Sequence, residues 1–240
     1  MVDALLSGGS VHWTCRFDSG LAHKKRLAPQ RAGLIFIFRP MIRNIIFDFG
    51  GVLVDWNPHH FYDGYFGSRE KADWFLANVC TMEWNIQMDG GKPFAEGIAE
   101  LQAQFPEWSH EIRLYFDNWI DMMGDEIPGS RELIIRLKEK GYPVYGLTNW
   151  SSETFCLVRH RYPVFDLLDG MVVSGEEHLL KPGHAIFERL LEKYGLQASE
   201  CLFTDDNEAN VAGAISAGLS ALRFTSASQL ASDLRSLGIL

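Results

Sequence analysis

The chain has 240 residues, of which 47% are hydrophobic and 22% are charged, and its formal net charge is −9 at pH 7. This composition is typical of a globular chain that buries a sizeable core, and no run approaches the roughly 20 apolar residues that a membrane span requires. An acidic chain repels nucleic acid and anionic membrane surfaces, so we expect neither as a partner. The four cysteines form no C-x-x-C pair, which argues against zinc and redox motifs and favours a cytoplasmic location.

Residues 1–40 differ in character from the remainder. They contain six basic and two acidic residues, so they carry +4 and the rest of the chain carries −13. They show no sustained periodicity and lack the continuous apolar segment of a signal peptide. A transit peptide or a nucleic-acid-binding arm would also be basic, but we favour extra sequence upstream of a natural start at Met41, dispensable for folding and activity.

The first strand signal follows shortly after Met41. Residues 45–47 form a short apolar run, and Asp48 and the pair Gly50 and Gly51 come directly after it. An Asp at the end of a strand is often only a turn residue, but the two glycines would let the backbone approach a bound anion. This segment is the first candidate for chemistry in the chain.

The segment between Asp55 and about Ile127 changes to helical patterns without strand signals. We expect helices at residues 68–80, 93–104 and 109–123. Five of the seven tryptophans fall in this segment: Trp56, Trp74, Trp84, Trp108 and Trp119. Because aromatic residues at helical spacing are more typical of a bundle core than of a ligand-stacking surface, we predict a helical insert over residues 56–127.

The remainder of the chain alternates between the two kinds of element. Strand-like runs lie at residues 143–147, 171–173, 201–203 and 221–224. Helical patterns lie at residues 130–140, 184–194 and 207–217, and a glycine follows each of them. This alternation predicts an α/β fold in which helices cover both faces of a doubly wound parallel sheet formed by residues 41–55 and 128–240.

Polar residues follow several of these strands. They are Asp48 with Gly50 and Gly51, Thr148 with Asn149, Lys181, and the pair Asp205 and Asp206. In an open parallel sheet, ligands bind outside the carboxyl ends of the strands, so we expect these side chains to converge on one site, with Trp150 beside them.

In type and order, these residues resemble the four motifs of the haloacid dehalogenase superfamily. Those motifs are an Asp after the first strand, a Thr or Ser after the second, a distant Lys, and an acidic pair after the fourth. The resemblance covers essentially all of residues 42–240 and implies a Rossmann-like core, with the insert similar to the helical cap of that superfamily.

The resemblance also implies a role for each residue. Asp48 would attack the substrate and form a covalent ester. The backbone of Gly50 and Gly51 would approach the phosphoryl group, and Thr148 and Asn149 would donate hydrogen bonds to it. Lys181 would neutralise charge on the nucleophile and on the transferring group.

A metal ion is expected from the charge balance. If the strand ends converge, Asp48, Asp205 and Asp206 share a small volume, and Lys181 alone cannot balance them. Mg²⁺ prefers oxygen ligands, and it suits Asp48, Asp205 as the main ligand, the Gly50 carbonyl, and Asp206 in support.

The sequence departs from the phosphatases of the superfamily at Gly50, where these usually carry a second Asp that acts as general acid and base. The motif is nevertheless similar to a subgroup that includes bacterial sugar-1-phosphate phosphatases. Asp55, His59 and His60 are candidates to replace the missing acid, although all three are more typical of exposed loop or cap residues.

We therefore predict a Mg²⁺-dependent phosphatase that acts on a small phosphorylated metabolite, as a monomer or a homodimer. One alternative is a 2-haloacid dehalogenase, but the metal-independent dehalogenases of the superfamily lack the acidic pair, and a haloacid carboxylate would be repelled here. The other is a catalytically weak or silent binding protein that retained the fold and lost the acid at Gly50.

Overall fold

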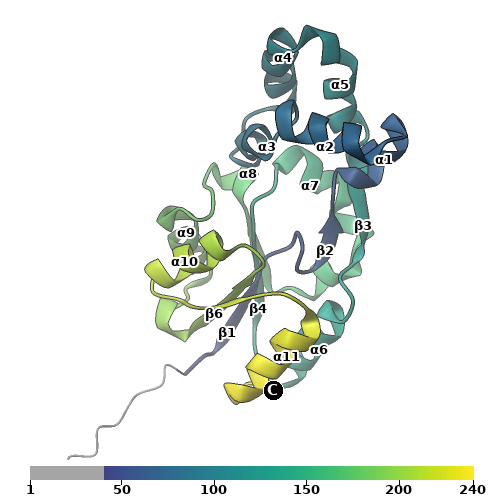
Figure 1. Ribbon diagram of the computed structural model, residues 1–240. Coiled ribbons are helices and arrows are strands. Elements are labelled where there is room, and N and C mark those ends of the chain that lie inside the picture. Colours follow the sequence, from purple (N-terminus) through teal and green to yellow (C-terminus); the bar gives the residue numbers. More distant parts are fainter. Residues whose placement is uncertain (1–40) are drawn as a thin grey trace, which may run out of the picture. The chain divides into compact units, whose positions relative to one another are not determined.

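The computed structural model describes residues 41–240 (Figure 1). The prediction that residues 1–40 are dispensable falls outside this range. Among the described residues, no helix combines the length and the apolar character that crossing a membrane requires.

Five strands form one parallel sheet, in the spatial order β5-β4-β1-β6-β7. They are β1 (Asn44–Phe47), β4 (Val144–Thr148), β5 (Gly170–Val173), β6 (Cys201–Asp205) and β7 (Ser220–Arg223). The chain builds outward from β1 first through β4 and β5, and then in the other direction through β6 and β7. This confirms the predicted doubly wound α/β fold and makes the carboxyl end of β1 the point where the strand order reverses, which is where such sheets bind ligands.

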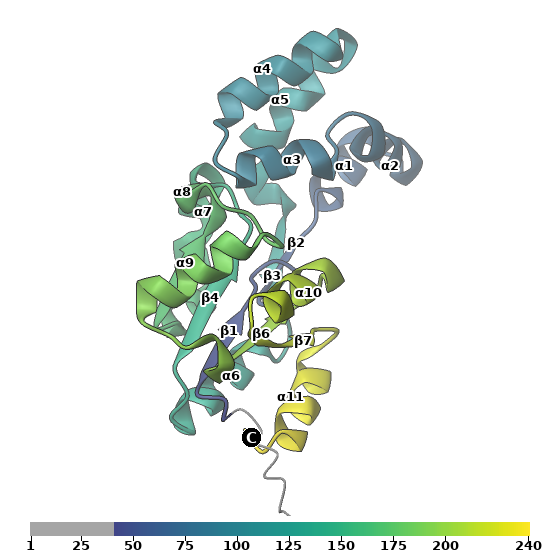
Figure 2. The same ribbon diagram turned by 90° about the vertical axis from the view of Figure 1, so that its left-hand side faces the viewer.

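Helices cover both faces of the sheet because successive side chains of each strand point to opposite sides. In β1, Ile45 and Phe47 pack into one hydrophobic cluster and Ile46 into the other. One face carries α9 (His184–Tyr194) and α10 (Glu208–Ser216). The other carries α6 (Ser130–Glu139), α7 (Ser152–Val158) and α11 (Ala227–Ser236), and Figures 1 and 2 show the two groups on either side of the strands.

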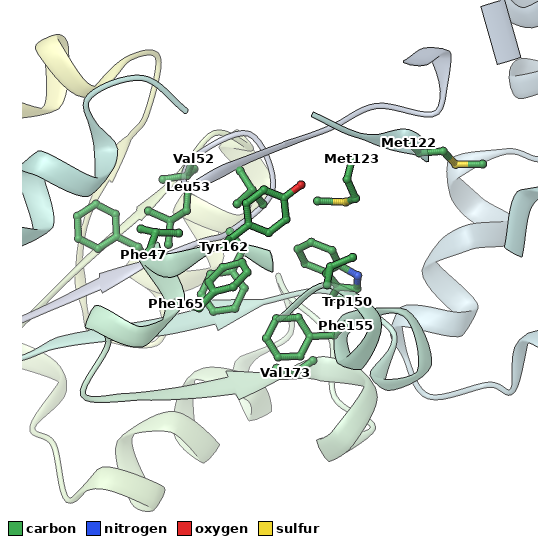
Figure 3. Close-up of a cluster of buried hydrophobic side chains, with 14 of the residues drawn as sticks. Phe47, Val52, Leu53, Met122, Met123, Trp150, Phe155, Tyr162, Phe165 and Val173 are labelled. Carbon is green, nitrogen blue, oxygen red and sulfur yellow. The ribbon is translucent and has the colours of Figure 1, made fainter. Parts of the chain in front are cut away.

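The larger cluster reaches from the sheet towards the site. Figure 3 shows Phe47, Leu53, Phe155 and Phe165 together, with Trp150 beside them. The rings of Trp150 and Phe155 lie 5.6 Å apart in an edge-to-face arrangement, which aromatic pairs prefer. The core therefore fixes the ring of Trp150 directly after the end of β4.

The helical insert, residues 57–122, lies beyond the carboxyl ends of the strands in both ribbon views (Figures 1 and 2). It contains α1 (His59–Phe66), α2 (Arg69–Asn78), α3 (Met82–Asp89), α4 (Phe94–Gln104) and α5 (Ser109–Asp117). Its core is aromatic: Tyr62 is buried among other rings and donates a hydrogen bond to the Glu111 carbonyl at 2.8 Å. Trp74 is the exception among the tryptophans of the insert, because it is exposed.

Two strands that the sequence did not predict join the insert to the sheet. The strands β2 (Val54–Trp56) and β3 (Met123–Glu126) pair antiparallel at the two ends of the insert. The expected helix over residues 109–123 is wrong at its end, because α5 stops at Asp117, a 3-10 turn covers Trp119–Met122, and Met123 already begins β3. β2 has only three residues and β3 lacks polar–apolar alternation, so their pairing depends on contacts distant in sequence.

Candidate active site

The ends of three neighbouring strands bring the predicted residues to one cavity of about 360 Å³. Asp48 follows β1, and its backbone N–H donates to the Thr204 carbonyl of β6 at 2.9 Å. Thr148 ends β4 and is buried, and Asp206 follows β6. The core end of the cavity is lined by Asp48, Gly50, Gly51, Thr148, Asn149, Lys181, Asp206, Asn207 and Asn210.

Lys181 is the centre of a buried charge network. Its Nζ lies 2.8 Å from Asp48 Oδ1 and 2.7 Å from Asp205 Oδ2, and it donates to the Leu147 carbonyl at 3.0 Å. Its side chain is 1% exposed. Burial alone would lower the pKa of the ammonium group, but Asp48 and Asp205 outweigh this effect and raise the pKa of Lys181. The lysine is therefore held in its charged form between two strand ends.

Asn149 fixes the backbone of Lys181. Its Oδ1 accepts from the Lys181 N–H at 2.9 Å, and its Nδ2 donates to the Lys181 carbonyl at 3.0 Å. The sequence predicted a phosphoryl donor at this position, whereas the carboxamide forms a reciprocal pair with the peptide groups of the lysine. This pair explains how a residue from the loop before α9 reaches the end of β1.

The two adjacent aspartates after β6 have different surroundings. Asp205 is fully buried, and in addition to contacting Lys181 its oxygens accept from the Asn207 N–H at 2.8 Å and from Asn210 Nδ2 at 3.1 Å. Asp206 is exposed and lines the cavity, which Asp205 does not. The sequence ranked Asp205 above Asp206 as a metal ligand, but the oxygens of Asp205 are already saturated with hydrogen bonds.

The structure has space for a side chain at position 50 but not at position 51. Gly51 has a φ of +71°, and a Cβ there would lie 2.6 Å from Asp206 Oδ2, so only glycine fits. A Cβ on Gly50 would meet nothing within 4 Å. The position where phosphatases of the predicted superfamily carry a second Asp is therefore open space at the edge of the cavity.

The carboxylates outnumber the cations in this cluster. Oxygens of Asp48, Asp205 and Asp206 lie within 4.8 Å of one another, and Lys181 is the cation between the first two. Burial, together with the charge of Asp205, raises the pKa of Asp48 to about 7 despite the opposing effect of Lys181. Although Asp206 is exposed as a residue, partial burial of its carboxyl group and the charge of Asp205 also raise its pKa. An all-oxygen cluster with excess negative charge fits a hard divalent cation such as Mg²⁺.

The three residues that the sequence offered as substitute acids do not line the cavity. His60 Nε2 lies 2.7 Å from Asp55 Oδ2, and His59 Nδ1 lies 2.8 Å from Asp63 Oδ1. These contacts join the start of the insert to itself and to the hairpin strand before it. Asp55, His59 and His60 therefore belong to the connection rather than to the site.

Asp89, at the end of α3, is a cavity residue that the sequence did not predict. Its Oδ1 accepts from the Ser151 N–H at 3.0 Å, its Oδ2 accepts from Asn85 Nδ2 at 3.1 Å, and its carbonyl accepts from Ser174 Oγ at 2.5 Å. Burial raises the pKa of Asp89 to about 7. These bonds hold the insert against the loop after β4, and nothing local in the sequence separates this Asp from a solvated one.

The insert and the two segments beside it close the far end of the cavity. We call this surface the distal wall, and it consists of Trp56, Met82, Asn85, Ile86, Asp89, Trp119 and Trp150. The rings of Trp56 and Trp119 stack with their centroids 5.4 Å apart. Trp150, which the sequence predicted near the site, does line the cavity. The cavity therefore combines charged and polar groups from the strand ends with a mainly apolar surface from the insert and its neighbours.

The chain is similar to several known proteins. A family profile described as haloacid dehalogenase-like hydrolase matches residues 42–218. A sesquiterpene phosphatase of Aspergillus oryzae is 29% identical over 195 residues, which cover 80% of this chain and 94% of that protein.

Two solved structures share the fold. An enzyme of the same family from Bacteroides thetaiotaomicron, in complex with magnesium and inorganic phosphate, matches with a TM-score of 0.60 at 23% identity, over 77% of this chain and 95% of that one. An L-2-haloacid dehalogenase from Xanthobacter autotrophicus matches with a TM-score of 0.58 at 17% identity, over 83% of this chain and 85% of that one. Phosphate-binding and dehalogenating proteins thus share this architecture, so the fold alone does not select a reaction.

Proposed function

Because this chain belongs to the haloacid dehalogenase-like hydrolase family, we propose that it is a Mg²⁺-dependent phosphatase acting on a small phosphate monoester. The observation that carries this proposal is the buried pairing of Lys181 with Asp48 and Asp205, beside a further carboxylate at Asp206. Phosphoryl transfer depends mainly on positioning and on charge stabilisation, and this arrangement supplies both. The named activity of the Aspergillus relative and the ligands of the Bacteroides structure support the same conclusion.

Asp48 is the proposed nucleophile. A carboxylate oxygen of Asp48 forms a bond to phosphorus while the bond from phosphorus to the alcohol oxygen breaks, and the leaving oxygen takes a proton from solvent. A water oxygen then attacks the same phosphorus and loses a proton to solvent. The bond between phosphorus and Asp48 breaks, which releases inorganic phosphate and restores the carboxylate.

The neighbouring residues hold the reacting groups. Lys181 fixes one oxygen of Asp48 and places a positive charge beside the phosphoryl group. Thr148 lines the same cavity and supplies a hydroxyl donor. Asn149 acts through Lys181, because its carboxamide bonds to the backbone of that residue.

Asp48, the Gly50 carbonyl and Asp206 are the proposed ligands of Mg²⁺, with Asp205 close enough to contribute. We rank Asp206 above Asp205 because hydrogen bonds from Lys181, Asn207 and Asn210 already occupy the oxygens of Asp205. When bound, the ion supplies positive charge that offsets the clustered carboxylates and the phosphoryl oxygens.

Phosphate release measured with Mg²⁺ and with a chelator, for wild type and Asp48→Asn, tests the proposal. We expect metal-dependent turnover of an aryl phosphate such as p-nitrophenyl phosphate, reduced by about a thousandfold or more in Asp48→Asn because the nucleophile is lost. Asp117→Asn, on the exposed surface of α5, is the matched control and retains activity.

Full turnover by a folded Asp48→Asn protein would contradict the assigned nucleophile. Halide release from a 2-haloacid without metal would favour the dehalogenase alternative. Phosphate binding without turnover in wild type would favour a silent binding protein, which the glycine at position 50 permits.

A further inference from the structure

The distal wall indicates which leaving alcohols fit the cavity. This step rests on the phosphatase function proposed above. In a cavity that holds the phosphoryl group at its core end, the organic part of the substrate faces the opposite end. The chemistry of the distal wall therefore restricts which alcohols fit.

Most of the distal wall is apolar. Trp56 and Trp119 stack on each other, and Met82 and Ile86 come from α3. Trp150 completes the surface from the core side, and its Nε1 is already paired with Thr154 Oγ1 at 3.1 Å. Flat aromatic rings and unbranched or branched aliphatic side chains favour burial of hydrocarbon rather than of charged groups.

The charges of the cavity also favour an uncharged leaving alcohol. Of the residues that line it, Lys181 alone is basic, and its ammonium group already contacts Asp48 and Asp205. The distal wall has no basic side chain and carries the carboxyl group of Asp89. A second phosphate or a carboxylate on the substrate would thus be desolvated without a counter-ion and placed near an acid.

Some neutral polar atoms of the distal wall lack hydrogen-bond partners. Within residues 41–240, four buried side-chain atoms form no hydrogen bond. Three belong to the distal wall, Trp56 Nε1, Trp119 Nε1 and Asn85 Oδ1, and the fourth, Thr204 Oγ1, lies in β6. These atoms are neutral and shielded from solvent, so they offer no counter-charge to an anionic group in the cavity.

We propose that the distal wall selects phosphate monoesters of uncharged, largely apolar alcohols and rejects esters with a second anionic group.

Three esters with leaving alcohols of the same chain length test this selection: hexyl phosphate, 6-hydroxyhexyl phosphate and 6-phosphooxyhexanoate. They present a methyl, a hydroxyl and a carboxylate at the far end, and the reacting end is unchanged. We expect kcat/KM for the carboxylate to be about tenfold or more below that of the other two, because one unpaired charge is desolvated. Equal or faster turnover of the carboxylate would overturn the proposal.

A charge placed in the distal wall should reverse the preference. Ile86→Lys puts an ammonium group where the cavity has none, and we expect it to raise kcat/KM for 6-phosphooxyhexanoate about tenfold and to lower that for hexyl phosphate. Gln87→Lys, on the exposed side of the same helix, is the matched control and leaves the preference unchanged. Met82→Lys is a second variant for the case that Ile86→Lys does not fold, because Met82 lines the cavity and is 56% exposed.

Binding separates failure of this inference from failure of the proposed function. The dissociation constants of the three esters for the Asp48→Asn protein, measured by calorimetry with Mg²⁺, do not depend on turnover. Tighter binding of the two uncharged esters supports the selection even if wild type hydrolyses none of them, in which case the proposed function alone fails. Equal or tighter binding of the carboxylate overturns the selection even if wild type is an active phosphatase.

Discussion

The two ends of the cavity are built in different ways. At the core end, Lys181 and Asp205 each contact several partners at 2.7–3.1 Å. Asn149 donates to the backbone carbonyl of Lys181, and Asn210 donates to the carboxylate of Asp205. The distal wall consists mainly of stacked and packed side chains, and three of its buried polar atoms are unpaired. Hydrogen-bonded networks fix a single geometry, whereas a packed apolar wall accepts a range of shapes. The difference separates the groups that we propose to react, which are fixed, from the more adaptable surface that we propose to recognise the alcohol.

Removing the positive charge of Lys181 should have the largest effect on stability and turnover. In Lys181→Met, Asp48 and Asp205 remain buried without their counter-charge, and we expect the free energy of unfolding to fall by about 3–5 kcal/mol at neutral pH, with turnover lost. Urea unfolding with fluorescence detection measures this. Lys193→Met, which removes a partly exposed ion pair with Glu177, should cost less than about 1 kcal/mol. Similar losses in the two variants would contradict the role of the network.

A new carboxyl group at position 50 should increase the turnover rate. The Cβ of Gly50→Asp enters open space, and its carboxyl group can supply the missing general acid. We expect kcat for an alkyl phosphate to rise about a hundredfold, with little change for p-nitrophenyl phosphate, whose leaving group needs no proton. Gly51→Asp is the matched control, because a side chain there collides with Asp206 at a φ of +71° and activity should fall. No gain in Gly50→Asp would show that acid catalysis does not limit this enzyme.

The stability of the contact between the insert and the loop after β4 should depend on pH, because Asp89 forms part of that contact. Its pKa is raised from 3.8 to about 7 by burial, so the folded chain binds more protons than the unfolded chain between these values. The contribution of this group to stability therefore falls as pH rises from 4 to 7. The variant Asp89→Asn stays neutral, so its stability relative to wild type should improve by about 2 kcal/mol between pH 5 and pH 8.

Urea midpoints at the two pH values measure this effect. Asp117→Asn on α5 serves as the control and should follow wild type at both values. A constant difference between Asp89→Asn and wild type would mean that Asp89 is ionised throughout and that its bonds to Ser151 and Asn85 act as charged contacts.

The sequence predicted the elements whose signals are local. The helix at residues 184–194 has the predicted limits, because Gly183 and Gly195 flank an amphipathic run. The hairpin strands β2 and β3 were missed, since a segment such as Met123–Glu126 is extended only through its distant partner. The doubly wound parallel sheet and the approach of the strand ends followed from the rules of parallel sheets rather than from any single residue, whereas the spatial order of the strands came only from the structure.

Within the candidate site, the sequence identified residue types better than it identified their contacts. Two adjacent aspartates are equivalent in a motif, but Asp205 is buried among donors and Asp206 faces the cavity, which depends on how the chain turns at the end of β6. Asp89 could not be found, because a polar residue on a helix becomes significant only when another segment covers it. Residues that act across the boundary between the insert and the sheet have no signature in their own neighbourhood.

The pairing of Trp56 with Met123 has an evolutionary consequence. These two residues are opposite partners in the β2–β3 hairpin, so the chain enters and leaves the insert at neighbouring points. A segment whose ends are pinned together can be lengthened, shortened or exchanged at little entropic cost to the rest of the protein. Asp48 lies outside this segment, whereas most residues of the distal wall lie inside it or at its borders. Descendants of one ancestral gene can therefore diversify in what they recognise while they inherit the same reacting groups unchanged.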